Sequence, residues 1–209
     1  KIKNNTQFSN NGNEIAWGTI GNASTSEGLF FETFNAAGVL QVPMIISVWD
    51  DEYGISVPAK YHTTKESISE ILKGFQRDKK SKGYEIFVVK GWDYSKVIDV
   101  YTEASTIARN EHVPVLIHVT ELTQPLGHST SGSHERYKNE ERLKWEAEHD
   151  CILKMREWII SVFENEEELI RIEKDAKKEV SSAKRIAWNN YLSKIIQSQK
   201  QVIDLLDKV

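Results

Sequence analysis

Short apolar runs alternate with amphipathic stretches through residues 1–133, and this alternation limits the possible folds more than any other feature of the sequence. Runs of strand length lie at residues 14–20, 44–49, 84–90 and 114–122. Apolar periodicity and polarity predict helices between them at residues 27–41, 64–80 and 94–110. Because strands separated by helices need crossover connections, we expect an α/β fold with a mostly parallel sheet and helices on both faces.

The content of charged residues changes near residue 134. Charged residues make up about a fifth of residues 1–133 but about two fifths of residues 134–209. Amphipathic helices are predicted at 135–148, 151–163 and 166–208, with Asn189-Asn190 as the point where the last could break. We therefore predict an α/β domain over 1–133 and a helical extension over 134–209.

Composition excludes several classes of protein. The net charge of −4 argues against a general nucleic-acid binder, which would normally be basic. No stretch of about 18 apolar residues occurs, so no membrane partner is expected. Cys151 is the single cysteine, which rules out a disulfide within the chain and agrees with a cytoplasmic location.

Small and polar residues follow each predicted strand. In open parallel sheets, ligands bind beyond the carboxyl ends of the strands. Four loops are expected at that edge, namely residues 21–24, 50–54, 91–93 and 124–133. Their convergence favours a binding site over four unrelated loops.

Each loop also has an ordinary interpretation when taken alone. Residues 21–28 could bind an anion through backbone N–H groups or could only cap a helix. Asp50 and Asp51 could bind Mg²⁺ or form a solvated acidic turn. His128 could contact a diphosphate or lie on a surface loop without a role. His118, on the fourth predicted strand, is expected to face the sheet interior or a covering helix.

The ordered set of motifs resembles the alpha part of the thiamine-diphosphate-dependent dehydrogenase (first) component of 2-oxoacid dehydrogenase complexes, of the branched-chain and pyruvate types. That family carries Gly-Asp-Gly, an interval of similar length, and Asn-Asn. Here Gly21-Asn22-Ala23 and Asp50-Asp51 are separated by 26 residues. The similarity extends over residues 14–160 and includes Gly-His-Ser-Thr-Ser at 127–131.

The resemblance implies thiamine diphosphate and Mg²⁺ as cofactors. Asn22 and Asp51 stand where the family has its two side-chain metal ligands, and Tyr53 would add its backbone carbonyl. In the family the first of these ligands is an acidic side chain and the second is an amide. Here the first is an amide and the second is acidic. The two ligands together still carry one negative charge, so we expect Mg²⁺ to be retained.

The resemblance also assigns residues to the diphosphate. Ala23 and Ser24 would offer backbone N–H groups, and Trp49 replaces a basic or polar residue of relatives at the cofactor. His128 matches the loop histidine that approaches the diphosphate, and it is the catalytic candidate. Gln124 stands where the family often has arginine, which leaves the diphosphate with fewer positive partners.

The implied reaction is oxidative decarboxylation of a 2-oxoacid, followed by acyl transfer to a lipoyl group on the transacylase component. The second half of the site would come from a beta-type part, and we expect the chain to belong to a fused alpha-beta polypeptide that forms a homo-oligomer. The isolated segment is expected to be inactive. The alternative is a non-catalytic scaffold or assembly module with a degenerate cofactor site.

Overall fold

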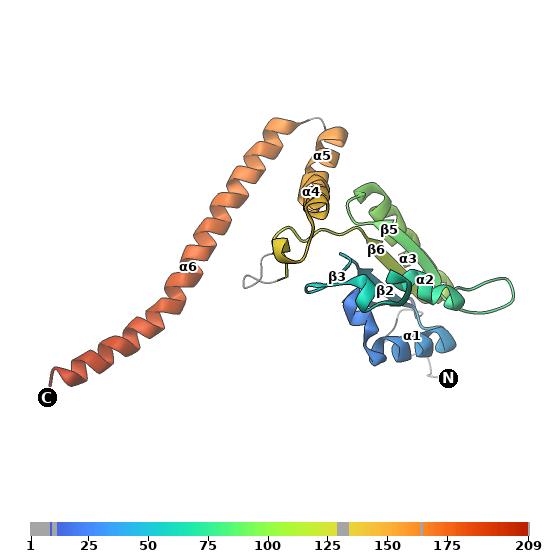
Figure 1. Ribbon diagram of the computed structural model, residues 1–209, viewed down its shortest axis with the longest axis horizontal. Coiled ribbons are helices and arrows are strands. Elements are labelled where there is room, and N and C mark those ends of the chain that lie inside the picture. The colour runs from blue at the N-terminus through green and yellow to red at the C-terminus, as the bar shows by residue number, and fades with distance from the viewer. Residues whose placement is uncertain (1–8, 10–11, 129–133, 164, 209) are drawn as a thin grey trace. The chain divides into compact units, whose positions relative to one another are not determined.

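The computed structural model describes residues 9, 12–128, 134–163 and 165–208 (Figure 1). Contacts between residues divide the chain into two compact units, Lys1–Trp158 and Ile159–Val209, and each is described by itself. The domain boundary between residues 133 and 134 rests on charge content, and it stays a prediction.

A four-stranded parallel sheet lies at the centre of the first unit, as the alternation predicted. Its strands are β1 (Ala16–Gly21), β2 (Met44–Trp49), β5 (Glu85–Lys90) and β6 (Val115–Thr120). Their order across the sheet is β1-β2-β6-β5, with Ile45 of β2 opposite Val115 of β6. Since all four strands run the same way, their carboxyl ends meet at one edge.

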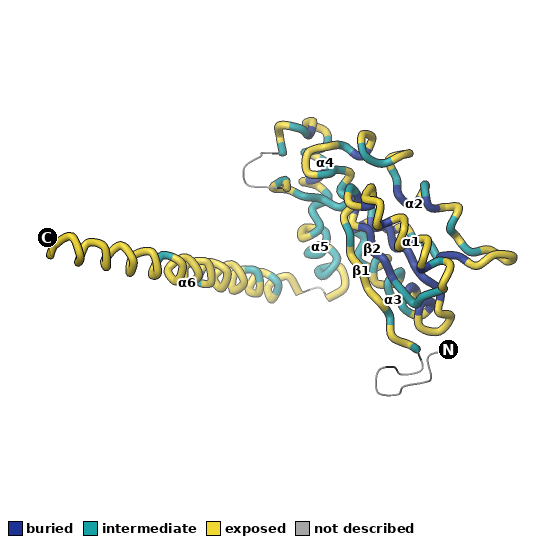
Figure 2. The backbone as a smooth tube through the Cα atoms, turned by 90° about the horizontal axis from the view of Figure 1, so that it is seen from below, coloured by how far each residue is buried: buried dark blue, intermediate teal, exposed yellow. Residues whose placement is uncertain are grey.

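Helices cover both faces of the sheet, which confirms the predicted α/β class. They are α1 (Gly28–Leu40), α2 (Ile68–Ile71) and α3 (Tyr94–Glu111). Phe34 of α1 is fully buried in a cluster with α2 on one face, and Ala104 of α3 is fully buried in a cluster on the other. β2 is therefore buried from both sides (Figure 2), which explains its continuous apolar run.

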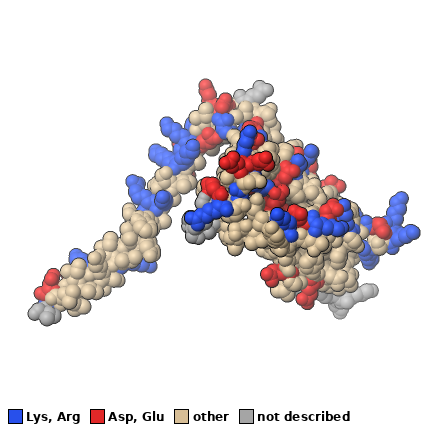
Figure 3. All heavy atoms as spheres, in the orientation of Figure 1, with Lys and Arg blue, Asp and Glu red and all other residues tan. Residues whose placement is uncertain are grey.

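The helix predicted over 64–80 is wrong as a single element. Short 3₁₀ turns at Thr64–Glu66 and Leu72–Phe75 flank α2 instead. Lys65 and Glu66 have φ values of 58° and 57°, which a continuing right-handed helix excludes. The loop after Phe75 carries the basic residues Arg77, Lys79, Lys80 and Lys82. Figure 3 shows Lys and Arg side chains gathered at the right of the view.

A small hairpin that the sequence did not predict follows β2. It pairs β3 (Tyr53–Gly54) with β4 (Val57–Pro58), and a 3₁₀ turn at Ala59–Tyr61 follows. Each strand has two residues, too few for an alternating pattern to be recognised. The hairpin holds the residues after β2 beside the edge of the sheet.

Helices follow β6 through the rest of the described chain. After a 3₁₀ turn at His134–Arg136 they are α4 (Glu140–Glu148), α5 (Cys151–Phe163) and α6 (Glu166–Leu206). α6 runs unbroken through Asn189-Asn190, because its 41 residues include neither glycine nor proline. Within the described residues, no helix combines the length and apolarity that crossing a membrane would need.

Candidate functional site

The loops after β1, β2 and β6 line one cavity of about 560 Å³ at the carboxyl edge of the sheet. All seven site residues assigned from the sequence lie in its lining: Asn22, Ala23, Ser24, Trp49, Asp51, Tyr53 and His128. The third predicted loop, residues 91–93, does not line it, because β5 lies at the opposite side of the sheet from β1. Asp93 instead accepts a hydrogen bond from the Lys96 N–H and caps α3.

The first loop is held to the second by the backbone rather than by a helix cap. The Asn22 N–H donates to the Trp49 carbonyl over 3.1 Å, which joins the ends of β1 and β2. Thr25 donates its hydroxyl to the Asn22 carbonyl, and Ser26 donates its hydroxyl to the His62 carbonyl, each over 2.6 Å. Glu27 precedes α1 without a side-chain capping bond, so the simple capping interpretation of this stretch is wrong.

Asn22 combines a place in the lining of the cavity with a buried side-chain polar atom. Its side chain is buried, with 6% of the residue exposed, and its Nδ2 has no hydrogen-bond partner within the part of the chain that the structure describes. A buried amide donor without a partner costs about 1–3 kcal/mol. Since rotation of the amide exchanges its nitrogen and oxygen, Asn22 can offer either a donor or a ligand oxygen to the cavity.

The two adjacent aspartates have different surroundings. Asp50 is buried, and its Oδ1 accepts from the Glu52 N–H over 2.7 Å. Asp51 lines the cavity, and its Oδ1 accepts from the Tyr53 N–H over 3.1 Å. The carboxylate predicted to bind metal is therefore the one that lines the cavity.

Asp50 belongs to a buried hydrogen-bonded chain with His118 and Ser69. Its Oδ2 lies 2.8 Å from Nε2 of His118, and Nδ1 of His118 lies 2.8 Å from Oγ of Ser69. Exposed fractions of 6%, 1% and 5% leave the serine no access to a substrate. This buried hydrogen-bonded trio is therefore structural and is not a nucleophilic triad. It confirms that His118 faces a covering helix.

Burial dominates the electrostatics of Asp51. Desolvation raises the pKa of its carboxyl above the usual range, and the neighbouring charge of Asp50 raises it further. The Tyr53 N–H and the charge of Lys138 act in the opposite direction. A divalent cation in the cavity would offset the same desolvation.

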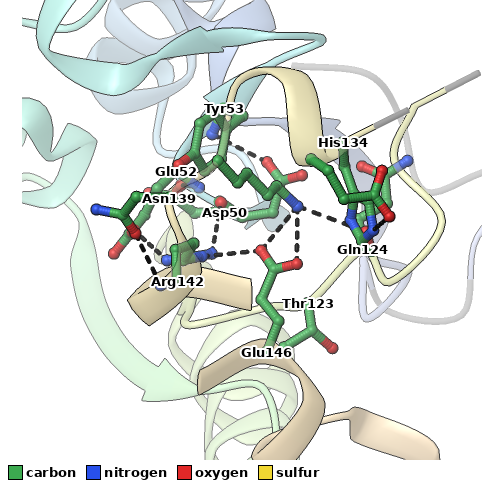
Figure 4. A network of polar contacts seen from close by, with 12 residues as sticks. Asp50, Glu52, Tyr53, Thr123, Gln124, His134, Asn139, Arg142 and Glu146 are labelled. Carbon is green, nitrogen blue, oxygen red and sulfur yellow. Dashed lines mark hydrogen bonds and ion pairs between the residues drawn. The ribbon is translucent and has the colours of Figure 1, made fainter. Parts of the chain in front are cut away.

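Charged residues of α4 and of the turn before it form a network that contacts the loop after β2, and the sequence did not reveal it (Figure 4). Glu146 accepts from Nζ of Lys138 over 2.8 Å and from Nε of Arg142 over 2.8 Å. Arg142 also pairs with Glu52 and donates to the Asp51 carbonyl over 3.0 Å. The spacing of four residues from 138 to 142 to 146 was the only signal, and the same spacing is typical of a solvated helix face.

His128 and Trp49 lie at the rim of the cavity. His128 is exposed, and Trp49 is 53% exposed, with its Nε1–H donating to Oγ of Ser47 over 3.0 Å. Gln124, in the place of the family arginine, also lines the cavity. Ser129, the next residue after His128, lies outside the described residues.

Comparison with known proteins addresses the resemblance directly. The family model described as dehydrogenase E1 component matches residues 5–195. The chain belongs to this family.

The E1 relatives are alpha subunits of 2-oxoacid dehydrogenases. Pyruvate dehydrogenase E1 component subunit alpha of Rickettsia bellii is 24% identical over 184 residues, which cover 88% of this chain and 54% of the relative. 3-Methyl-2-oxobutanoate dehydrogenase subunit alpha of Mycobacterium tuberculosis is 30% identical over 141 residues, which cover 67% and 36%. This E1 chain thus spans about half the length of the first of these relatives.

The metal candidates of this E1 chain form a mixed donor set. Within the part of the chain that the structure describes, no three His, Cys, Asp or Glu side chains converge as a metal cluster. The assigned set has one carboxylate from Asp51, one amide from Asn22 and one backbone carbonyl from Tyr53. Such a set suits a hard cation that takes its remaining ligands from phosphate and water.

Proposed function

We propose that this chain forms the part of a thiamine-diphosphate site that binds Mg²⁺ and the diphosphate, within the first component of a 2-oxoacid dehydrogenase. One observation carries the proposal, namely the unpaired buried amide of Asn22 in the same cavity as the Asp51 carboxyl. A buried donor beside a carboxylate suits a ligand that brings both anionic oxygens and a divalent cation.

The residues present fit Mg²⁺. Asp51 would supply a carboxylate oxygen and Tyr53 a backbone carbonyl, while the amide oxygen of Asn22 would complete the protein share. Mg²⁺ usually keeps one or two carboxylates together with phosphate oxygens and waters. The amide-then-acidic order thus keeps the same total ligand charge as the acidic-then-amide order of the family.

Other residues of the cavity would hold the diphosphate. Ala23 and Ser24 lie in the 3₁₀ turn before α1, where backbone N–H groups and the helix dipole favour an anion. Trp49 and His128 would close the rim, with His128 steadying the diphosphate or the incoming substrate. Bound thiamine diphosphate supplies the electron sink for decarboxylation of a 2-oxoacid.

The complete reaction needs more than this chain. We propose that a beta-type part, on the same polypeptide or on another subunit, forms the other half of the site, and that a lipoyl-bearing transacylase component accepts the acyl group. The full protein would assemble as a homo-oligomer, and the 209-residue segment alone would have no turnover. The names of the relatives support the dehydrogenase class.

A second candidate is a non-catalytic scaffold with a degenerate site. The amide at Asn22 and the neutral Gln124 favour it, because both lower the charge that the site offers to a metal diphosphate. The exchanged ligand pair favours the catalytic proposal, since random loss would not preserve its total charge.

The ligand exchange can be tested by measuring Mg²⁺ affinity in the full-length protein with thiamine diphosphate present. Asp51→Asn is expected to weaken Mg²⁺ binding by about tenfold or more, because it removes the one carboxylate of the set. Adding Asn22→Asp to that variant restores the family order and is expected to restore affinity. Asp78→Asn, a surface turn residue, is the control. Little or no loss with Asp51→Asn would refute the exchange.

A further inference from the structure

Lys138 is a buried cation near the candidate metal site, and among the described residues it pairs with one carboxylate, that of Glu146. Its Nζ lies 2.8 Å from both carboxylate oxygens of Glu146, and the two side chains are 1% and 2% exposed. Nζ of Lys138 also lies 3.5 Å from the Gln124 carbonyl oxygen. The same Nζ lies 5.3 Å from the centre of the ring of Tyr53, a residue that lines the cavity with Asp51.

We propose that Glu146 is a positioning residue that keeps the positive charge of Lys138 away from Asp51, so that the Asp51 carboxylate stays available to a divalent cation. The inference rests on the proposed function, because it takes Asp51 as a metal ligand. It assigns a role to a residue of α4 that does not itself line the cavity.

The pairing of charges supports this role. Two cations, Lys138 and Arg142, lie among the carboxylates of Glu146, Glu52 and Asp51. Glu146 pairs with both cations, and Glu52 takes a second bond from Arg142. Both cations are therefore neutralised without the Asp51 side chain, whose oxygen bonds instead to the Tyr53 N–H.

Loss of Glu146 would change this pairing. A buried ammonium without a counter-charge is strongly unfavourable, so Lys138 would take another carboxylate. Arg142 keeps Glu52 through a separate bond, whereas Asp51 has no ion pair in this network. Lys138 would then pair with Asp51 and compete with the metal, since both are cations drawn to the same carboxylate.

Glu146 also has a geometric effect that must be separated from the electrostatic one. It fixes Nε of Arg142 over 2.8 Å, and Arg142 donates to the Asp51 backbone carbonyl. If only this geometry mattered, removing Lys138 as well would leave the loss of Glu146 unrepaired. If the charge of Lys138 is the cause, removing Lys138 would repair it.

The test is a calorimetric titration of the full-length protein with MgCl₂ in the presence of saturating thiamine diphosphate. Glu146→Gln is expected to weaken Mg²⁺ binding by about tenfold. The double variant Glu146→Gln/Lys138→Met is expected to bind Mg²⁺ within about threefold of wild type. Glu148→Gln, an exposed residue of the same helix, is the matched control and should leave the affinity unchanged.

The outcomes separate this inference from the proposed function. A wild-type protein that binds no Mg²⁺ with thiamine diphosphate would overturn the proposed function itself. A wild-type protein that binds, with Glu146→Gln unchanged or not repaired by Lys138→Met, would overturn only the role of Glu146. Lys138→Met alone should bind Mg²⁺ as tightly as wild type or more tightly. If Glu146→Gln does not fold, Lys138→Met alone is the deciding variant. Weaker Mg²⁺ binding by Lys138→Met would contradict the inference.

Discussion

Gly54 lies where the hairpin after β2 comes closest to the first loop. A Cβ atom at this position would lie 2.7 Å from Cβ of Ala23, closer than two carbon atoms pack, with the His62 ring 3.5 Å away. The close approach requires glycine here because there is no room for a methyl group. The identity of one residue thus sets the distance between the two loops that carry Asn22 and Tyr53.

Gly54→Ala is therefore expected to lower the free energy of unfolding of the full-length protein by about 1–3 kcal/mol. It should also weaken Mg²⁺ binding, because the hairpin must move away from Ala23. Gly74→Ala is the control, since nothing lies within 4 Å of its Cβ position, and it should change stability by about 0.5 kcal/mol or less. Chemical denaturation measures both, and equal stabilities of the two variants would contradict the steric account.

Single residues also show where sequence reasoning stops. Asp50 and Asp51 are chemically identical in the sequence, and the resemblance alone assigned the metal to Asp51. The structure buries Asp50 against His118 and leaves Asp51 in the lining of the cavity. A residue on the neighbouring strand decides which of the two carboxylates is buried. No local sequence pattern shows which residue that is.

At the scale of elements, His118 ties together the end of β2, strand β6 and helix α2. It contacts Asp50 through Nε2 and Ser69 through Nδ1. His118→Leu would leave the Asp50 carboxylate buried without this partner, so the free energy of unfolding should fall by about 3 kcal/mol. His118→Gln keeps a donor for Asp50 and should cost clearly less.

Ser69→Ala provides the comparison for His118, because it removes one side-chain hydrogen bond and should cost about 1 kcal/mol. Denaturation curves of the three variants in the full-length protein would rank them as His118→Leu, His118→Gln and Ser69→Ala, from the largest loss to the smallest. Equal losses for leucine and glutamine would mean that His118 acts only by filling space.

Elements were predictable where one period extended over enough residues. The strand over 44–49 and the helix over 151–163 have the predicted bounds, since apolar content and spacing alone set them. The helix predicted over 64–80 is interrupted at its start by the positive φ values of Lys65 and Glu66, and it ends at Gln76, whose backbone is extended. Residue type alone does not indicate these backbone conformations. α6 continues through its asparagines because a modest propensity penalty does not break a long helix.

At the scale of the whole molecule, the cavity could be predicted because parallel strands bring their carboxyl ends to one edge. That rule, together with the family resemblance, is enough to gather the seven assigned residues from the sequence alone. The support from α4 could not be predicted in the same way. Lys138 and Glu146 look like surface charges in the sequence, and only tertiary packing buries them.

We infer that this E1-family chain forms the metal and diphosphate end of a thiamine-diphosphate site. The most direct measurement is calorimetric titration of the full-length protein with thiamine diphosphate, with and without Mg²⁺, using thiamine as the control ligand. The account predicts binding of thiamine diphosphate that requires Mg²⁺ and is lost when the diphosphate is absent. No binding at millimolar thiamine diphosphate, with Mg²⁺ present and the protein folded, would contradict it and favour the scaffold.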